Sequence, residues 1–427
     1  MKRMFVFVSL IMTLSLFVLP GNLSGDVPPG AVPERIVLNV TANPAREMAI
    51  TWRTGPGVKN SQVEYMIATS MSYWKYKNRK NADPYKDTKF QTAVNETVNL
   101  GNGSIVLQHS VVLKNLKPDT LYQYRVGSGE TWSEWEHFRT AAAEEKPFKF
   151  IFLGDPQNEL KSMCSRVFRT AYAAAADAAF VLIGGDLVTK PWQDFAWGEL
   201  FYAAGWISRR VPFILVAGNH GYYLKNKKGV TKRQHRFWRP HFTQPGNGPN
   251  GLEETAFFID YQGVRLIVLN GNEKLLEQQK WLVGLLADNP NRWTIIAIHH
   301  PFYSTGSDRD NPALRVLFQP TIDKYAVDLI LQGHDHTYGR TYKLRNGKIV
   351  PDSEKGTVYV VSVSGPKFYS INEKHKHLMK KLGTGLQLYQ VIWVDGDVLR
   401  YESRTVTDEL YDSFELRKPA AEPAPDK

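Results

Sequence analysis

The sequence is poor in cysteine: its 427 residues include only Cys164. No disulfide can therefore form within the chain, and no zinc site can be built from several thiolates. A bound metal would have to use His, Asp, Glu or Asn side chains instead. Hydrophobic residues make up 43% of the chain and aromatic residues 12%, which excludes a chain that is disordered throughout. This length predicts two or three domains, since a domain averages about 150 residues.

Acidic residues are also in short supply. The chain has 53 Lys and Arg against 42 Asp and Glu, a formal charge of +11, which indicates an anionic partner or substrate. Much of this charge lies in one segment without an acid, Leu224 to Pro240. Its cations are Lys225, Lys227, Lys228, Lys232, Arg233, Arg236 and Arg239. The segment either attracts a phosphorylated substrate or is an ordinary solvated run, and Arg233 and Arg236 are its candidate substrate-binding residues.

Long hydrophobic runs are absent except at the start of the chain. Met4 to Pro20 carry no charge, follow Lys2 and Arg3, and precede a polar stretch of small residues that ends at Gly25. This order is typical of a secretory signal peptide over residues 1–25, with a retained membrane anchor as the alternative. We therefore expect a secreted or periplasmic protein with no stable membrane insertion after cleavage. The single cysteine favours a bacterial source, since secreted eukaryotic proteins are often rich in disulfides.

Residues 33–143 alternate between polar and apolar side chains with a period of two. The alternating runs are short, are separated by turn residues and include 36–40, 48–52, 110–113 and 121–126. Several short strands of this kind predict a β-sandwich. Leu116 to Gly127 resembles the closing strands of a fibronectin type III module, so we expect such a domain here, as a structural spacer or as a binding module.

Residues 147–410 show a different pattern, in which buried apolar runs alternate with helical stretches. The apolar runs are 148–153, 180–183, 212–216, 294–298 and 327–331, and the clearest helix is 275–286. This alternation predicts an α/β domain. Residues 357–363 and 386–406 return to alternating strands, with a turn at Asp395 and Gly396. We expect a disordered tail over 411–427.

Each apolar run of the α/β domain ends in a polar cluster. The five clusters are Gly154-Asp155-Pro156-Gln157, Gly185-Asp186, Gly218-Asn219-His220, His299-His300 and Gly333-His334-Asp335-His336. Ligands bind outside the carboxyl ends of the strands in an open α/β sheet, so the clusters should meet at one site. Carboxylates, an amide and imidazoles favour Zn, Mn or Fe over calcium. One Gly-Asp at a strand end is usually only a turn, but five clusters in order indicate a metal site.

Together these clusters resemble the five-block signature of the calcineurin-like metallophosphoesterases. With a fibronectin-like domain before it and Gly333 to Arg340 as its last block, the chain is most similar to the purple acid phosphatase branch. The resemblance implies a four-layer α/β fold with helices flanking two central β-sheets, and a site for two divalent metal ions. It also implies the ligands: Asp186 for both metals, Asp155 and His336 for the first, and Asn219, His299 and His334 for the second.

The resemblance assigns a catalytic role to His220, next to Asn219. This histidine would stabilise the phosphate or protonate the leaving group, with a purely hydrogen-bonding role as the alternative. Asn219 and His220 are also candidate substrate-binding residues. In the fourth cluster His300 is the alternative ligand to His299. His334 and His336 lie two apart, so an extended backbone would direct both imidazoles to one side.

Three positions depart from the family pattern. Thr189 stands where purple acid phosphatases have the tyrosine that binds ferric iron, and Gln157 stands where other metallophosphoesterases have a histidine. Gln157 is a candidate weak ligand or the holder of a bound water. Gly221 replaces a common acidic residue. We therefore predict no purple ferric centre and place the metals among Mn, Zn and Fe.

These observations predict an exported phosphoesterase with two metal ions. The resemblance implies hydrolysis of phosphate monoesters by a hydroxide that bridges the metals. A phosphodiesterase or nucleotidase using the same site is the first alternative, and a surface-binding or adhesion protein with a structural metal site is the second. The expected partner is a phosphorylated small molecule rather than a specific nucleic acid.

Overall fold

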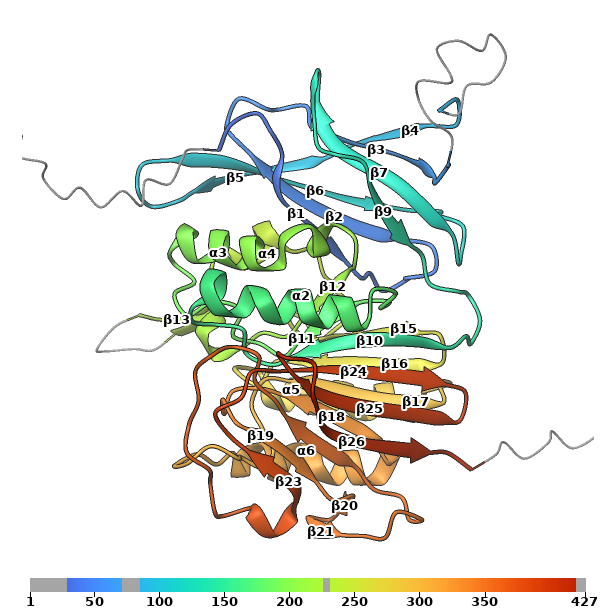
Figure 1. Cartoon of the computed structure of the whole chain (residues 1–427), viewed down its shortest axis with the longest axis vertical. Helices are drawn as coiled ribbons and strands as arrows, with labels where there is room; N and C mark the ends of the chain where they lie inside the picture. The colour runs from blue at the N-terminus through green and yellow to red at the C-terminus, as the bar shows by residue number, and fades with distance from the viewer. Residues whose placement is uncertain (1–28, 71–84, 226–230, 420–427) are drawn as a thin grey trace, which may run out of the picture.

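The computed structural model describes residues 29–70, 85–225 and 231–419 (Figure 1). The predicted signal peptide and residues 420–427 lie outside these ranges. Within them, no helix is both long enough and apolar enough to cross a bilayer. The α-helices are α2 (Ser165–Ala174), α3 (Asp194–Ala204), α4 (Trp238–His241), α5 (Leu275–Ala287) and α6 (Pro312–Tyr325). Single helical turns occur at η1 (Leu160–Cys164), η2 (Gly205–Arg209), η3 (Asn219–Gly221) and η4 (Lys376–Leu378).

The N-terminal region is the predicted β-sandwich, in blue to cyan at the top of Figure 1. One layer contains β1 (Glu34–Asn39), β2 (Met48–Thr54), β6 (Ile105–Leu113) and β5 (Val94–Asn99). The other contains β4 (Lys89–Thr92), β3 (Gln62–Ile67), β7 (Leu121–Ser128), β8 (Thr131–Trp132) and β9 (Glu136–Arg139). Alternate side chains of both layers form one core, in which Trp52, Tyr124 and Phe138 are buried. The period of two arises because successive side chains of a strand point to opposite faces.

Two central sheets stack face to face below the sandwich, and the first of them is continuous with one sandwich layer. The first has the order β26 (Leu410–Arg417), β25 (Val398–Thr405), β24 (Leu388–Asp395), β10 (Phe148–Leu153), β11 (Val181–Ile183) and β12 (Phe213–Leu215). The second has the order β15 (Phe257–Tyr261), β16 (Val264–Leu269), β17 (Trp293–Ile298), β18 (Leu329–Gln332), β22 (Val358–Val361), β19 (Tyr338–Thr341) and β23 (Met379–Gly383). Small hairpins pair β13 (Tyr222–Lys225) with β14 (Thr231–Gln234) and β20 (Leu344–Arg345) with β21 (Lys348–Ile349).

Helices cover the outer face of each central sheet, which produces the predicted four layers (Figure 1). In β10, Phe152 faces the second sheet while Leu153 packs in the core beneath α2 and α3. In β17, Ala297 faces the first sheet while Ile298 packs beneath α5 and α6. Strands buried on both faces have continuous apolar sequences. This is why the five apolar runs predicted β10, β11, β12, β17 and β18.

The sandwich is joined to the α/β region by a strand pairing that the sequence pattern did not predict. β1 pairs in parallel with β12 through Asn39 and Phe213, so one sandwich layer continues the first central sheet. Ion pairs reinforce the junction, because Asp194 of α3 lies 2.7 Å from both Arg35 and Arg53. Such pairings join residues far apart in the chain, so the local periodicity of the sequence cannot predict them.

The prediction of a disordered tail over 411–427 is wrong for its first part. Leu410–Arg417 forms β26, which pairs antiparallel with β25 at the edge of the first sheet. Asp412 of this strand accepts hydrogen bonds from the Tyr338 hydroxyl and from Nε of Arg340, each at 2.7 Å. An edge strand has a polar composition because much of it faces solvent, so its composition resembles that of a disordered segment.

Replacing Asp412 by Ala should lower the free energy of unfolding by about 3 kcal/mol, because it leaves Arg340 and Tyr338 without their carboxylate partner. The side chains of Arg340 and Asp412 are only 9% and 8% exposed. Urea unfolding followed by tryptophan fluorescence measures the loss. Glu415→Ala on the same strand is the control, since Glu415 and its partner Arg417 are 38% and 69% exposed. A loss no larger than that of the control would contradict the prediction.

Candidate metal centre

The five polar clusters lie at the carboxyl ends of the central strands. In the first sheet, Asp155 follows β10, Asp186 follows β11 and Asn219 follows β12. In the second sheet, His299 follows β17 and His334 follows β18. The strands of each set pair in parallel, so each set ends on one side of its sheet.

Asp186, His299 and His334 form the centre of the site. Their ligand atoms lie within 4.8 Å of one another, and Oδ2 of Asp186 is 3.2 Å from Nε2 of His299. Nε2 of His299 is also 3.1 Å from Oδ1 of Asn219 and 3.1 Å from Nδ1 of His334. Ligand atoms from three other strand ends thus surround one imidazole nitrogen.

Asp155 and His336 form a second group that Gln157 joins to Asp186. Nε2 of His336 lies 3.5 Å from Oδ2 of Asp155 and 2.9 Å from Nε2 of Gln157. The Gln157 amide also donates to Oδ2 of Asp186 at 3.3 Å. Oδ2 of Asp155, Oε1 of Gln157 and Nδ1 of His336 are buried without a hydrogen-bond partner among the described residues. Such orphaned atoms are costly, and a metal ion would satisfy the carboxylate oxygen.

Close packing explains two of the glycines in the clusters. A Cβ atom on Gly218 would clash with Oδ1 of Asp186, and one on Gly333 would clash with Oδ1 of Asp155. These glycines therefore leave room for the carboxylates. Gly185 differs because its φ of 106° also requires backbone that side-chain-bearing residues rarely adopt.

The prediction of extended backbone at His334 and His336 is wrong. Both residues have positive φ, 73° and 49°, within a bend between β18 and β19. Asp186 likewise has a φ of 44°. Backbone in this region costs about 1–3 kcal/mol for residues other than glycine, and such strain gathers at functional sites. The two imidazoles reach the site because the chain bends there.

Burial and neighbouring charges shift the titration of the clustered groups. Burial raises the pKa of Asp155 to about 7. Burial alone would lower the pKa of His299, but the carboxylates of Asp186 and Asp155 raise it to about 9. Burial lowers the pKa of His336 to about 3. Carboxylates and neutral imidazoles are the forms that bind metal ions, and a divalent cation offsets the repulsion between two buried carboxylates.

His220 borders the cluster and is partly exposed. Its Nδ1 lies 2.8 Å from the carbonyl oxygen of Thr189, so Nδ1 carries the hydrogen and donates it. Its Nε2 lies 4.0 Å from Oδ2 of Asp186, and 31% of the side chain is exposed. An imidazole fixed through one nitrogen can exchange a proton through the other.

The geometry favours His299 over His300 as the ligand from the fourth cluster. His299 contacts both Asp186 and Asn219. His300 instead packs against the ring of His334, with the ring centres 4.6 Å apart.

Part of the basic segment Leu224 to Pro240 is folded into the core. Phe237 and Trp238, at the start of α4, are buried. Arg239 pairs with Glu254 at 3.1 Å. Arg236 is exposed, and its guanidinium lies 5.0 Å from the ring centre of Phe237. The side chain of Arg233 lies outside the described residues, and the described contacts of Arg236 include no residue of the metal cluster.

Three residues that the sequence analysis did not select lie against the last cluster. The ring of Tyr369 stands edge-on to His336, with ring centres 5.2 Å apart. Nη1 of Arg309 donates to the carbonyl oxygen of His334 at 2.9 Å, and Nζ of Lys367 lies 4.9 Å from the Tyr369 ring centre. No local motif marks these positions, because only the folding of two loops brings them to the site.

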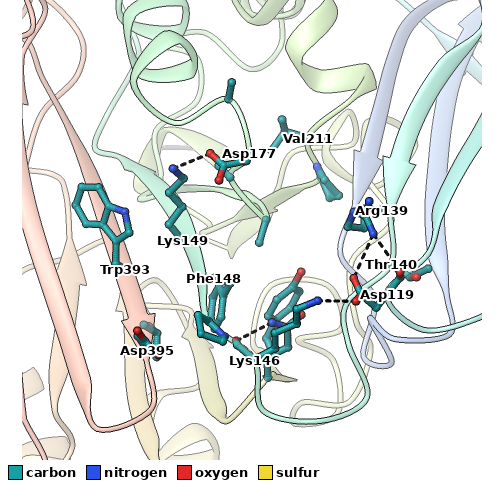
Figure 2. Close-up of a pocket in the computed structure, with 18 of the residues that line it drawn as sticks. Asp119, Arg139, Thr140, Lys146, Phe148, Lys149, Asp177, Val211, Trp393 and Asp395 are labelled. Atoms are coloured by element: carbon teal, nitrogen blue, oxygen red, sulfur yellow. Dashed lines mark hydrogen bonds and ion pairs between the residues drawn. The ribbon is translucent and has the colours of Figure 1, made fainter.

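A separate cleft of about 920 Å³ opens between the sandwich and the first central sheet (Figure 2). Phe148 and Lys149 line it, so it lies at the opposite end of β10 from Asp155. Several of its charges are already paired: Lys149 with Asp177 and Lys146 with Asp119, each at 2.6 Å. None of the metal-cluster residues, all of which are described, lines this cleft. The cleft is therefore separate from the clustered candidate ligands.

Two family models match the chain. The model described as calcineurin-like phosphoesterase matches residues 129–338, which include all the candidate metal ligands. The chain is thus a calcineurin-like metallophosphoesterase, the class that its layered fold and clustered ligands define. The model described as the N-terminal domain of purple acid phosphatase matches residues 33–140, the β-sandwich. Within that class, the chain is most similar to the purple acid phosphatases.

Individual proteins are also similar to the chain. Uncharacterized protein Rv2577 of Mycobacterium tuberculosis is 27% identical over 374 residues, 76% of this chain and 67% of the relative. Fe(3+)-Zn(2+) purple acid phosphatase 12 of Arabidopsis thaliana is 25% identical over 373 residues, 79% of this chain and 73% of the relative. The structure of purple acid phosphatase PPD1 from yellow lupin has a TM-score of 0.73 at 18% identity, covering 91% and 74% of the two chains. The predictions of this family and of a metal-dependent phosphatase are confirmed.

Proposed function

We propose that the chain hydrolyses phosphate monoesters at a centre of two divalent metal ions. Asp186, His299 and His334 carry this proposal, because three ligand atoms from three strand ends lie within 4.8 Å of one another. Asp155, Asn219 and His336 would complete the set of residues that hold the ions, and Asp186 would serve both.

The donor set suits divalent cations. Two carboxylates, one amide and three imidazoles match the preferences of Zn, Mn and Fe. The buried Oδ2 of Asp155 has no hydrogen-bond partner among the described residues, which leaves it available as a ligand. When bound, the two ions supply hydroxide at neutral pH and neutralise the phosphoryl oxygens.

The chain's own residues hold the carboxylates in place and move a proton. Oδ1 of Asp155 accepts the backbone N–H of His334 at 2.7 Å, and Oδ1 of Asp186 accepts that of His220 at 2.8 Å. These bonds set the carboxylates before the substrate arrives, so less reorganisation is needed during the reaction. In its doubly protonated form, His220 can donate the proton on Nε2 to the leaving alkoxide while Nδ1–H stays bonded to Thr189.

Removing the metals and adding them back tests the proposal. Chelation should lower the hydrolysis of nitrophenyl phosphate about 100-fold or more, since metal ions contribute several kcal/mol of charge stabilisation. Mn, Zn or Fe(II), supplied singly and in pairs, should restore the activity, and elemental analysis should find two ions per chain. Full turnover in demonstrably metal-free protein would rule the proposal out.

Because Thr189 replaces the iron-binding tyrosine of purple acid phosphatases, we expect a colourless enzyme. A visible charge-transfer band requires a tyrosinate bound to ferric iron, and the candidate ligand set contains no tyrosine. The iron-loaded protein should therefore show no strong visible band in its absorption spectrum. If a band appeared, Tyr369→Phe would show whether Tyr369, the aromatic neighbour of His336, is its source.

The same assay separates the alternatives. Bis-nitrophenyl phosphate reports phosphodiester hydrolysis, and a higher kcat/KM for this diester than for the monoester would favour a phosphodiesterase. Absence of metal-dependent turnover for both esters would favour a surface-binding protein with a structural metal site.

We also propose that residues 1–25 are a signal peptide and that the protein is exported. Mass spectrometry of the protein recovered from outside the cytoplasm would test this, because cleavage removes the mass of the signal peptide.

A further inference from the structure

Two cations share one aromatic ring beside the proposed metal centre. The guanidinium carbon of Arg309 lies 4.7 Å from the ring centre of Tyr369, and Nζ of Lys367 lies 4.9 Å from it. The same ring stands edge-on to His336, a proposed metal ligand. Positive charge is thus concentrated beside the site where a phosphate ester would react, with the Tyr369 ring between the cations and His336.

The two loops that carry these cations are tied to each other. The backbone N–H of Ser307 donates to Ser370 at 2.8 Å, and that of Asn372 donates to Thr305 at 2.8 Å. The Asn372 side chain donates to the carbonyl oxygen of Arg309 at 2.7 Å. A site held in this way loses little conformational freedom when it binds a ligand.

The neighbouring carboxylates offset only part of the charge of the two cations. Asp335 forms one long ion pair with Arg309, with its Oδ1 3.7 Å from Nη1, while its Oδ2 accepts the backbone N–H of Thr305 at 2.6 Å. Asp310 is paired with Arg315 and Lys374, each at 2.6 Å. Within the described part of the chain, Lys367 forms no ion pair, and its ammonium group lies over the ring of Tyr369. The loops therefore retain positive charge that can bind an anion.

Arg309 lies outside the ring of metal ligands. Its Nη1 donates to the backbone carbonyl oxygen of His334, and among the described residues its ion pair is with Asp335 rather than with a side chain of the proposed ligands. Its side chain is 28% exposed, so the rest of the guanidinium can meet a ligand from solvent. An anionic group bound there is distinct from the phosphoryl group at Asp186.

We propose that Arg309 and Lys367 form a subsite for a second anionic group of the substrate. The chain then prefers phosphate monoesters that also carry a carboxylate or a second phosphate a few bonds from the ester. A guanidinium fork matches either anion, and an ammonium adds an adjustable point charge. This inference rests on the proposed function for the phosphoryl half of the substrate only.

Non-hydrolysable phosphonates test the subsite by binding alone. 4-Phosphonobutyrate and butylphosphonate differ by a terminal carboxylate, so the ratio of their dissociation constants in the metal-loaded protein isolates the second anion. Calorimetry should show about tenfold tighter binding of 4-phosphonobutyrate, equivalent to about 1.4 kcal/mol. This preference should fall as salt is added, because partly exposed charges are screened. Butane-1,4-bisphosphonate, measured in parallel, distinguishes a second phosphate from a carboxylate.

Lys367→Ala and Arg309→Gln should each reduce the preference to about threefold or less, since each removes one of two cations. Arg400→Ala is the matched control, because the guanidinium of Arg400 also lies over an aromatic ring, 4.5 Å from the ring centre of Trp393. Trp393 pairs with Lys149 at the end of β10 opposite to Asp155, so Arg400 is remote from the proposed metal centre. It should keep the full preference. Equal binding of the two phosphonates by the wild type, or an undiminished preference in both variants, would overturn the subsite alone. Failure of both phosphonates to bind would overturn the proposed function together with it.

Discussion

Asp186→Asn should lower kcat/KM for a phosphate monoester at least about 1,000-fold, or roughly 4 kcal/mol of transition-state stabilisation. Oδ2 of Asp186 lies 3.2 Å from His299 and 3.3 Å from Gln157, so this carboxylate connects the two groups of ligands. Asparagine keeps the shape and can still accept the backbone N–H of His220 through its oxygen. It removes the negative charge that two cations would share, and the cations then repel each other without compensation.

The experiment needs a structural control and a metal measurement. Asp177→Asn removes a carboxylate that is 78% exposed and pairs with Lys149 at the opposite end of β10. It should leave kcat/KM within twofold of the wild type. Elemental analysis should find fewer than two ions in Asp186→Asn, with an unchanged circular dichroism spectrum. If monoester turnover survived in this variant at the wild-type rate, the proposed mechanism would have to be abandoned.

His220→Ala should lower kcat for an alkyl phosphate about 100- to 1,000-fold, the usual contribution of a general acid. The Nδ1 bond to Thr189 orients the ring, and Nε2 is the nitrogen left to protonate the leaving group. Nitrophenolate leaves without protonation, so the loss should be clearly smaller for nitrophenyl phosphate. Steady-state kinetics with glycerol phosphate and nitrophenyl phosphate measure the difference.

His377→Ala is the control for this variant. His377 is exposed on the short turn η4, and its removal should change neither rate constant. Equal losses of kcat for the two esters in His220→Ala would contradict proton donation. They would instead favour the hydrogen-bonding role, in which the His220 ring acts through its Nδ1–H bond to the carbonyl oxygen of Thr189 at 2.8 Å.

Much of the fold could be predicted because its strands are buried in a regular way. The run 148–153 coincides with β10, and the helical run 275–286 coincides with α5 except for its last residue. A strand that is covered on both faces is apolar throughout, and a helix that is covered on one face has apolar residues every three to four positions. Edge strands break these rules. This is why β26, with its partly exposed pattern, was mistaken for a tail.

The candidate site was predictable for a different reason. The five residues Asp155, Asp186, Asn219, His299 and His334 each lie within four residues of the end of a buried strand, and parallel strands end together. The bend at His334 and His336 was not predictable, because positive φ at a histidine is imposed by the contacts of the folded loop. No pattern marks Arg309, Lys367 and Tyr369, since their loops meet only through backbone bonds such as that from Ser307 to Ser370.

The sequence by itself determined the two kinds of domain, the order of the central strands along the chain and the chemical nature of the ligands at their ends. These features are local, since each depends on a few consecutive residues. The tertiary structure alone decided the pairing of β1 with β12, the anchoring of Tyr338 and Arg340 by Asp412, and the placement of two cations beside His336. Those features depend on contacts between residues distant in the chain, whose energies are realised only when the layers pack.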